Sequence, residues 1–175
     1  AAALARQAHV PTPVAQPEVL EKIDYDAHWR IRFRPEATLH LGTTPVQFFH
    51  LGTYFRQPVR IFAVKDGAAR EVIYSPGQFD MPEDSPARAL AGNAGYAGFR
   101  IMRPDMQSDW ISFLGAAYFR TDGALRQYGL SARGVALNTG LSIPEEFPRF
   151  TEFYIEEDAE GRTVIHALLD GPSVA

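Results

Sequence analysis

The sequence predicts an all-β protein with the architecture of a β-sandwich. Short apolar stretches with period-two alternation recur along the chain, and turn residues separate them. The 14 glycines and 13 prolines fall largely between these stretches, as expected for many short strands. Almost no stretch shows the 3.6-residue period of an amphipathic helix. A length of 175 residues with 46% apolar side chains suffices for one domain with a real core.

The first 24 residues are predicted to form an arm that lies over the domain formed by residues 25–175. Residues 1–6 could form a helical turn, and the prolines that follow prevent a regular helix. Residues 17–22 fit one short helix with proline in its first turn.

The domain is predicted to begin with a half-buried strand near residue 29. Trp29, Ile31 and Phe33 alternate with three arginines at positions 30, 32 and 34. We interpret the arginines as a solvated face in preference to a binding stripe. Trp29 is expected in the core in preference to acting as a platform for a sugar ring.

Eight further strands are predicted from apolar runs bounded by glycine, proline or acidic residues. Asp66 and Gly67 form a strong hairpin-turn signal. Residues 75–98 read as a long loop with a short helical segment at 86–91, and such loops are usually functional or mobile. Trp110 is expected to pack in the core. The predicted strands cover residues 46–51, 59–64, 70–74, 99–102, 110–114, 135–137, 147–155 and 163–169.

Composition excludes several classes of function. The formal net charge is −4 and no basic block is present, so nucleic acid is not an expected partner. The chain has no cysteine, which excludes disulfides, thiol catalysis and cysteine-based zinc sites. No apolar run of about 18 residues occurs, so no membrane span is predicted. Phosphate-loop, dinucleotide and nucleophile-elbow motifs are absent.

The titratable residues give no catalytic or metal-binding signature. Acidic clusters at residues 145–146 and 156–158 are interpreted as solvated ends of strands, and Asp170 as a turn-capping residue. We assign no catalytic residue, no metal and no cofactor. The five histidines lack ligand spacing and are expected to be packed or hydrogen-bonded; they are His9, His28, His40, His50 and His166.

The strongest candidate for a binding site lies in residues 113–120 and 128–134. Tyrosine rings can stack on a sugar, arginines can bind its hydroxyl groups, and nearby glycines let the backbone approach a ligand. The same residues also fit the bends and rims of an ordinary sheet, and both readings stay open. The candidate substrate-binding residues are Tyr118, Arg120, Tyr128, Ser131 and Arg133.

Several segments, in order and at matching spacing, resemble one known family. FLGAAYFR, YGLSARGVALNTG, EEFPRFTEFYIE and HALLDGPSVA are similar to the periplasmic glucan biosynthesis proteins, the OpgG/OpgD or MdoG family. YDAHWRIRFRPEATL and QFFHLGTYFRQPVRI resemble the opening of the same family. The resemblance covers about residues 24–175.

The resemblance carries expectations about fold and function. It implies a galactose mutarotase-like β-sandwich, of which this chain would be the N-terminal portion, and a periplasmic location after removal of an export signal. The partner implied is a β-1,2-linked glucan, oligosaccharide or polysaccharide. The family's members resemble glucanases or transglycosylases, whose catalytic aspartates would lie beyond this chain, so the chain alone is expected to be inactive.

Two alternatives to an enzyme remain. One is a non-catalytic module that binds glycans or acts as a scaffold, and the other is a purely structural sandwich. If the chain is a portion of a larger sandwich, its open strand edges would need a cover. A second copy of the chain, in a homo-oligomer, or the remainder of the protein could supply that cover.

Overall fold

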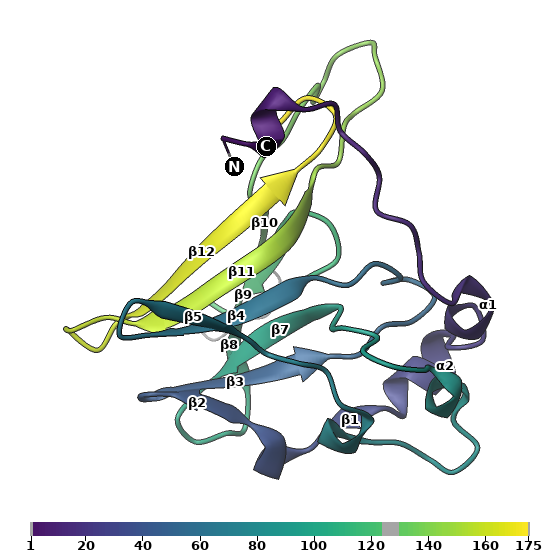
Figure 1. The fold of residues 1–175 in the computed structure, drawn as a ribbon, viewed down its shortest axis with the longest axis vertical. Coiled ribbons are helices and arrows are strands. Elements are labelled where there is room, and N and C mark those ends of the chain that lie inside the picture. Colours follow the sequence, from purple (N-terminus) through teal and green to yellow (C-terminus); the bar gives the residue numbers. More distant parts are fainter. Residues whose placement is uncertain (1, 124–129, 175) are drawn as a thin grey trace.

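A computed structural model describes residues 2–123 and 130–174, which form two packed sheets and a small strand pair (Figure 1). The larger sheet has the strand order β10-β9-β8-β7-β3-β2, and the smaller sheet the order β12-β11-β4-β5. The larger sheet consists of β2 (Leu39–Leu41), β3 (Thr44–Phe49), β7 (Gly98–Met102), β8 (Asp109–Leu114), β9 (Tyr118–Thr121) and β10 (Leu130–Arg133). The smaller sheet consists of β4 (Arg60–Lys65), β5 (Ala68–Glu71), β11 (Arg149–Glu157) and β12 (Thr163–Asp170). The fold is therefore the all-β, sandwich-like arrangement that the sequence predicts.

Short helical elements and a strand pair surround one end of the larger sheet. The pair joins β1 (Arg32–Phe33) to β6 (Phe79–Asp80) in antiparallel register. The helical elements at this end are α1 (Pro17–Leu20), α2 (Tyr25–Trp29), η2 (Pro35–Ala37), η3 (Pro76–Gln78) and η4 (Pro86–Ala89); η1 (Leu4–Arg6) lies apart from them, near the end of β12 (Figure 1). No helix in the described part of the chain is long and apolar enough to cross a membrane.

Phenylalanine rings from both sheets interlock in the core. Phe99 of β7 stacks on Phe113 of β8, and both rings meet Phe153 of β11 edge-on. Phe99 and Phe153 are essentially inaccessible to solvent. Burying one such side chain contributes roughly 1.5–3 kcal/mol. The inward positions of each strand are therefore fixed, and the alternate positions must face outward.

The structure corrects the first predicted strand. Residues 25–29 form α2, because the Asp24 side chain accepts a hydrogen bond from the Ala27 amide (2.9 Å) and caps the helix. Trp29 is 69% exposed and stacks on Tyr25 one turn earlier, so it is not a core residue. The strand that follows has only two residues. The alternation of apolar residues and arginines over residues 29–34 is too short to form a strand where the capped helix precedes it.

Other boundaries differ in smaller ways. The predicted strand at 135–137 is wrong, since only Leu137 forms an isolated bridge, with Glu146. The glycine-rich candidate region contains two strands, β9 and β10, that the sequence did not predict as strands. The turn at Asp66 and Gly67 is confirmed, with both residues at positive φ as a type I′ hairpin requires.

Polar contacts tie the N-terminal residues to the end of β12 and to the loop before β4, and the segment ends in the core. His9 Nδ1 lies 3.2 Å from Asp170 Oδ2 at the end of β12, and Gln57 Nε2 donates to the Thr12 carbonyl (2.8 Å). Leu20 and Ile23 are fully buried. Residues 2–23 therefore contribute both surface contacts and apolar packing to the domain.

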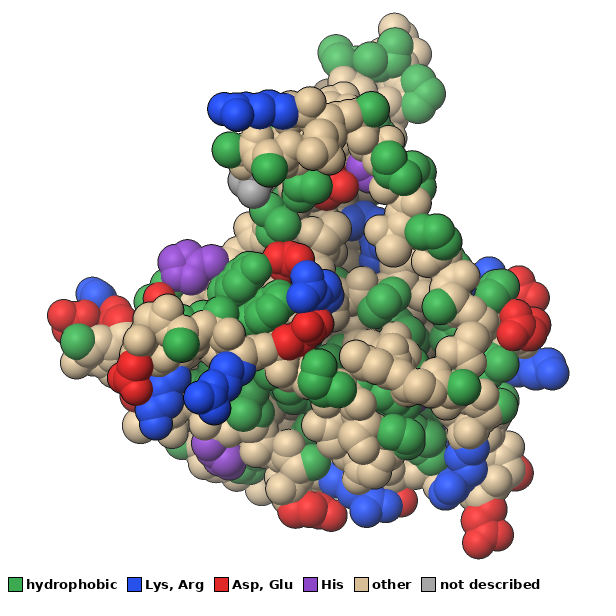
Figure 2. Space-filling model, in the orientation of Figure 1, with side chains coloured by type: hydrophobic (Ala, Val, Ile, Leu, Met, Phe, Trp, Pro, Cys, Tyr) green, Lys and Arg blue, Asp and Glu red, His purple; other side chains and the backbone are tan. Residues whose placement is uncertain are grey.

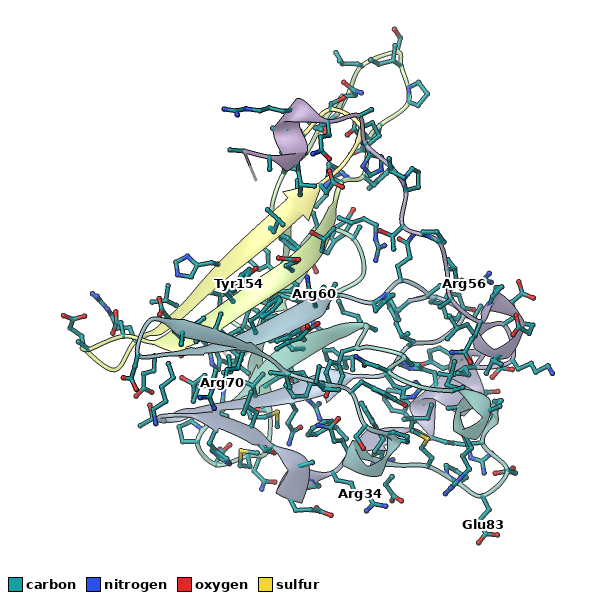
Figure 3. The ribbon with its side chains drawn as sticks, in the orientation of Figure 1. Arg34, Arg56, Arg60, Arg70, Glu83 and Tyr154 are labelled. Carbon is teal, nitrogen blue, oxygen red and sulfur yellow. The ribbon has the colours of Figure 1, made fainter. Side chains whose placement is uncertain are left out.

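The outer face of the smaller sheet carries a cluster of charged and aromatic side chains whose charges are paired with one another (Figures 2 and 3). Arg60 pairs with Glu71 (3.0 Å) and Glu152 (2.9 Å), and its guanidinium lies over the Phe62 ring. Phe62 in turn stacks on Tyr154, with ring centroids 4.6 Å apart. The cation on this face is thus neutralised within the protein.

Candidate functional site

A row of polar residues crosses the outer face of the larger sheet. The strand register places Gln47 opposite Arg100, Arg100 opposite Ser112, Ser112 opposite Arg120, and Arg120 opposite Ser131. Residues directly opposite each other share a sheet face. The neighbouring positions hold Phe48, Phe99, Phe113 and Phe119, which belong to or pack against the core. The polar row, Gln47-Arg100-Ser112-Arg120-Ser131, therefore faces away from the smaller sheet.

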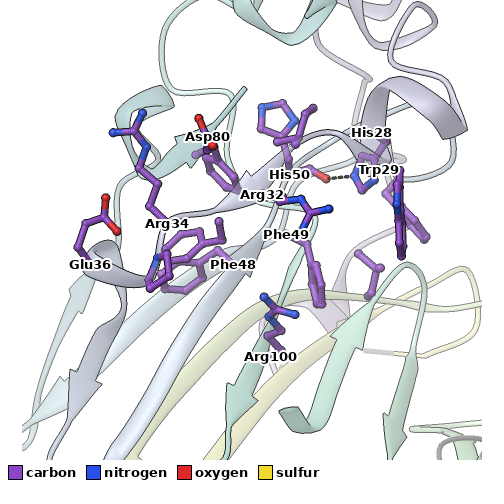
Figure 4. A pocket seen from close by; sticks show the side chains of 16 residues that line it. His28, Trp29, Arg32, Arg34, Glu36, Phe48, Phe49, His50, Asp80 and Arg100 are labelled. Atoms are coloured by element: carbon purple, nitrogen blue, oxygen red, sulfur yellow. Dashed lines mark hydrogen bonds between the residues drawn. The ribbon is translucent and has the colours of Figure 1, made fainter. Parts of the chain in front are cut away.

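A pocket of about 850 Å³ opens above one end of this row (Figure 4). Phe49, Arg100 and Leu114 come from the sheet, and His28 and Trp29 come from α2. The segment that contains β1 and η2, together with β6, completes the wall. We call this cavity the main pocket; its other lining residues are Ile31, Arg32, Phe33, Arg34, Pro35, Glu36, Phe48, His50, Phe55, Phe79 and Asp80.

A relay of hydrogen bonds orients Arg100 in the main pocket. Arg100 Nη2 donates to Gln47 Oε1 (2.8 Å), and Gln47 Nε2 donates to Thr38 Oγ1 (3.0 Å). The Thr38 hydroxyl donates to the Pro35 carbonyl (2.6 Å) in η2. Gln47 is only 3% exposed, and the Arg100 guanidinium also lies 5.7 Å from the centroid of the Phe49 ring. Arg100 is therefore held in place before any ligand arrives.

The charges of the main pocket are not paired with one another. Arg32, Arg34 and Arg100 line it together with Glu36 and Asp80, and none of the five forms an ion pair with a described residue. Three guanidinium groups against two carboxylates leave an excess of one positive charge. Such groups are free to donate to, and accept from, the hydroxyls of a ligand.

His50 gives the pocket wall a neutral, fixed imidazole. Its Nδ1 lies 2.7 Å from the Leu51 carbonyl and its Nε2 lies 2.9 Å from the Tyr74 hydroxyl. A carbonyl only accepts, so Nδ1 carries the proton and Nε2 accepts from Tyr74. Burial lowers the pKa of His50 to about 4 and raises the pKa of Tyr74 to about 12. The His28 Nε2 atom contacts the His50 carbonyl (2.8 Å), so both histidines are hydrogen-bonded, as predicted.

A metal site needs several ligating side chains close together. No group of three or more histidine or acidic side chains in residues 2–123 and 130–174 could hold a metal ion.

Four of the five residues predicted to bind substrate lie on the same sheet face as the main pocket. Arg120 and Ser131 belong to the polar row, and Tyr118 lies opposite Arg133 at the other end of the β9-β10 pair. Tyr118 is 37% exposed. The fifth, Tyr128, lies outside the described residues.

Several side-chain contacts constrain Arg133, a member of this predicted set. Its guanidinium lies 5.7 Å from the Tyr118 ring centroid and 5.5 Å from that of Phe147, and it pairs with Glu145. The hydrogen bond from Arg133 to Glu145 raises the pKa of Arg133. Any ligand that approaches this end of the face would meet a preassembled aromatic–guanidinium cluster rather than a mobile side chain.

The acidic residues interpreted as solvated ends of strands are exposed or half-buried, and several of them also bind specific partners. Glu145 pairs with Arg133, Glu146 accepts from the Ser173 amide (2.9 Å), and Glu157 accepts from both the amide and the hydroxyl of Thr43. Those two bonds lower the pKa of Glu157. Local sequence could not reveal partners that lie 114 positions away.

Asp170 was predicted to cap a turn, and its carboxylate instead meets the ring of His9. The separation of 161 positions between the two residues explains why the pattern around Asp170 gave no hint of it.

Sequence reasoning missed most of the main pocket. Arg32 and Arg34 are exposed, as the prediction of a solvated arginine face expects, but they also line the cavity. Arg30, the third arginine of this predicted face, pairs with Asp84 instead. Gln47 and Arg100 were not singled out. Arg100 is the only polar residue of the apolar strand Gly98–Met102, which is a local signal, but its bond to Gln47 is not visible in the sequence.

The fold and this site define a class of protein: an all-β sandwich whose larger sheet carries a polar, aromatic-lined pocket on its outer face. Residues 1–175 match the family described as periplasmic glucan biosynthesis protein, MdoG, and the chain belongs to this family. The resemblance seen in the sequence is thereby confirmed.

Curated relatives agree with this assignment. The chain is 47% identical over 191 residues to glucans biosynthesis protein D 2 of Ralstonia nicotianae, covering 99% of the chain and 35% of that protein. It is 44% identical over 177 residues to glucans biosynthesis protein D of Xylella fastidiosa, covering 97% of the chain and 32% of that protein. It is 40% identical over 182 residues to the protein of the same name in Xanthomonas campestris pv. campestris, covering 100% of the chain and 34% of that protein. The chain thus spans about a third of the length of these relatives.

Proposed function

We propose that the protein acts in periplasmic glucan biosynthesis by binding a β-linked glucan on the outer face of its larger sheet. The observation that carries this proposal is the coincidence of the main pocket and the polar row on one face. Family membership supports the glucan as ligand and the periplasm as location. The preference for a β-1,2 linkage rests on the family resemblance.

The chemistry of the face suits a sugar chain. Trp29, Phe49 and Phe55 offer apolar ring surface to the C–H faces of pyranose rings. The unpaired guanidinium and carboxylate groups can bind hydroxyls, and the cavity of about 850 Å³ lies within the range of ligand pockets. The other outer face lacks this character because its arginine is already neutralised by two glutamates.

Binding, and not cleavage, is the activity proposed for this chain. Glycoside cleavage needs two carboxylates placed on either side of the scissile bond. We assign no residue of this chain to that role. For the whole protein we propose hydrolysis of, or transfer to, a glucan with carboxylates that lie outside these 175 residues.

Tryptophan fluorescence tests the proposal directly, because the chain has only two tryptophans. Trp110→Phe leaves Trp29, at the edge of the main pocket, as the sole tryptophan reporter. Titration with linear β-1,2-glucan oligosaccharides should change its emission in a saturable way, while a maltooligosaccharide of equal length should give a weaker response. An emission spectrum that does not respond to any β-glucan would contradict the proposal.

A further inference from the structure

A second, smaller cavity of about 310 Å³ lies beside the main pocket. Phe55 lines both cavities, so its ring forms part of the partition between them. We call this cavity the side pocket. The N-terminal segment, the loop after β3, the turn after β8 and the first residue of β11 meet there; the lining residues are Val14, Thr53, Tyr54, Phe55, Arg56, Gln57, Gly115, Ala116 and Arg149.

Arg149 is the unusual member of the side pocket. It is half-buried at the start of β11, and among residues 2–123 and 130–174 its one side-chain hydrogen bond is from Nη2 to the Gln57 carbonyl (3.3 Å). A guanidinium has five N–H groups. No described carboxylate forms an ion pair with Arg149, and burial lowers its pKa. A partly desolvated cation without a counter-charge is an unfavourable arrangement unless something else supplies the anion.

The second arginine of the side pocket shows the contrast. Arg56 Nη1 pairs with Glu21 (3.2 Å), and Arg56 Nε donates to the Thr53 carbonyl (2.9 Å). The protein therefore pairs the Arg56 guanidinium with an acid, whereas no described acid pairs with that of Arg149. The uncompensated positive charge of the side pocket is that of Arg149.

Two of the residues that line the side pocket, Gly115 and Ala116, have no large side chain. Gly115 has φ +84°, and a Cβ atom added there would lie 3.4 Å from a ring carbon of Phe55. Ala116 follows it. A left-handed glycine and a methyl group leave the cavity open where a longer side chain would fill it.

We propose that the side pocket is a binding site for an oxyanion, a phosphate or carboxylate group, held by the guanidinium of Arg149. Arginine binds such groups through two parallel N–H···O bonds, and the unused N–H groups of Arg149 supply these donors. The oxyanion is either a free ion or a group carried by a larger ligand that also reaches the main pocket past Phe55. The proposal does not depend on glucan binding.

Backbone amide NMR shifts test the side pocket site by site. Inorganic phosphate and glucose 6-phosphate are titrated separately, with neutral glucose as the reference ligand. We expect saturable shifts at Gly115 and Ala116 with both anions. Arg149→Gln should lower the affinity for each anion at least about tenfold, and Arg149→Lys should lower it less. Arg70→Gln, which alters an exposed arginine of β5, should leave the response unchanged.

The two anions distinguish the source of the oxyanion. Tighter binding of glucose 6-phosphate would identify a group carried on a sugar, and equal affinities would identify a free anion. Three results would each overturn the proposal: shifts confined to main-pocket amides such as Phe49 and Leu114, equal shifts with neutral glucose, or an Arg149→Gln response like that of the wild type. If Arg149→Gln does not fold, Ala116→Leu serves instead, since it fills the pocket, retains Arg149 and should abolish the shifts.

Discussion

Arg100 and Arg120 stand in one cross-strand row, each directly opposite Ser112 of β8. Adjacent strands lie about 4.8 Å apart, so the two arginine backbones are separated by about 10 Å on the same sheet face. Arg100 belongs to the main pocket, and Arg120 to the region that the sequence singled out as a binding site. The relationship joins two sets of candidate residues into one continuous surface.

Replacing Arg100 should weaken glucan binding without unfolding the protein. Arg100→Met keeps the apolar stem but removes a guanidinium that no described carboxylate neutralises. A hydrogen bond to a charged group contributes about 1.5–3 kcal/mol, so affinity for a β-1,2-glucan oligosaccharide should fall at least about tenfold by calorimetry. Arg70→Met on the other sheet is the matched control and should bind like the wild type. Equal affinities of the two variants would remove Arg100 from the site.

Gln47 should act through Arg100. Gln47→Leu removes both the acceptor for Arg100 and the donor to Thr38 at a buried position. We expect a loss of roughly 1–3 kcal/mol in the free energy of unfolding, measured with urea, together with weaker glucan binding. Gln107→Leu, at an exposed turn, should change neither quantity measurably. Normal glucan affinity in Gln47→Leu would show that the relay does not position the arginine.

The cap of α2 should influence both stability and binding. Asp24→Ala deletes the side-chain bond to the Ala27 amide and should cost about 0.5–2 kcal/mol in unfolding free energy. Because α2 carries His28 and Trp29 into the main pocket, glucan affinity should fall as well. Asp26→Ala, in the first turn of the same helix without a capping bond, is expected to have the smaller effect. Equal effects of the two substitutions would contradict the capping role.

Stability should fall as the pH drops below about 6.5, in part through His50. Burial lowers the folded-state pKa of His50 from 6.5 to about 4, so the unfolded chain binds more protons between these values. Unfolding free energy therefore rises with pH across this window, by an amount on the order of 3 kcal/mol from this group. In urea titrations at pH 7, 5.5 and 4, the unfolding free energy of His50→Gln should depend less steeply on pH than that of the wild type. His40→Gln, at an exposed site, should show the same pH dependence as the wild type. An unaltered slope in His50→Gln would assign the effect to other groups.

The strands of the core were predictable because alternation is a local signal. The runs around Phe48, Phe99, Phe113 and Phe153 carry large apolar side chains at every second position, and each became a strand. The helix at Tyr25–Trp29 was not predicted because one capping aspartate outweighed a short alternation.

The candidate site was only half predictable. Tyrosine and arginine among glycines pointed to Arg120 and Ser131, and the structure places both in the polar row. Gln47 and Arg100 escaped notice because their meaning depends on strand pairing across 53 positions, which no local pattern encodes. The main pocket likewise needs α2, β1 and β7 together.

The measurement that most directly tests the central claim is an amide-shift map of a β-1,2-glucan oligosaccharide titrated into the protein. The largest shifts should fall along the outer face of the larger sheet, at Arg100, Ser112 and Arg120, and at Trp29 above the main pocket. Phe62 and Tyr154, on the outer face of the smaller sheet, should not move. Saturable shifts at the latter pair with none along the polar row would contradict the assignment of the binding face.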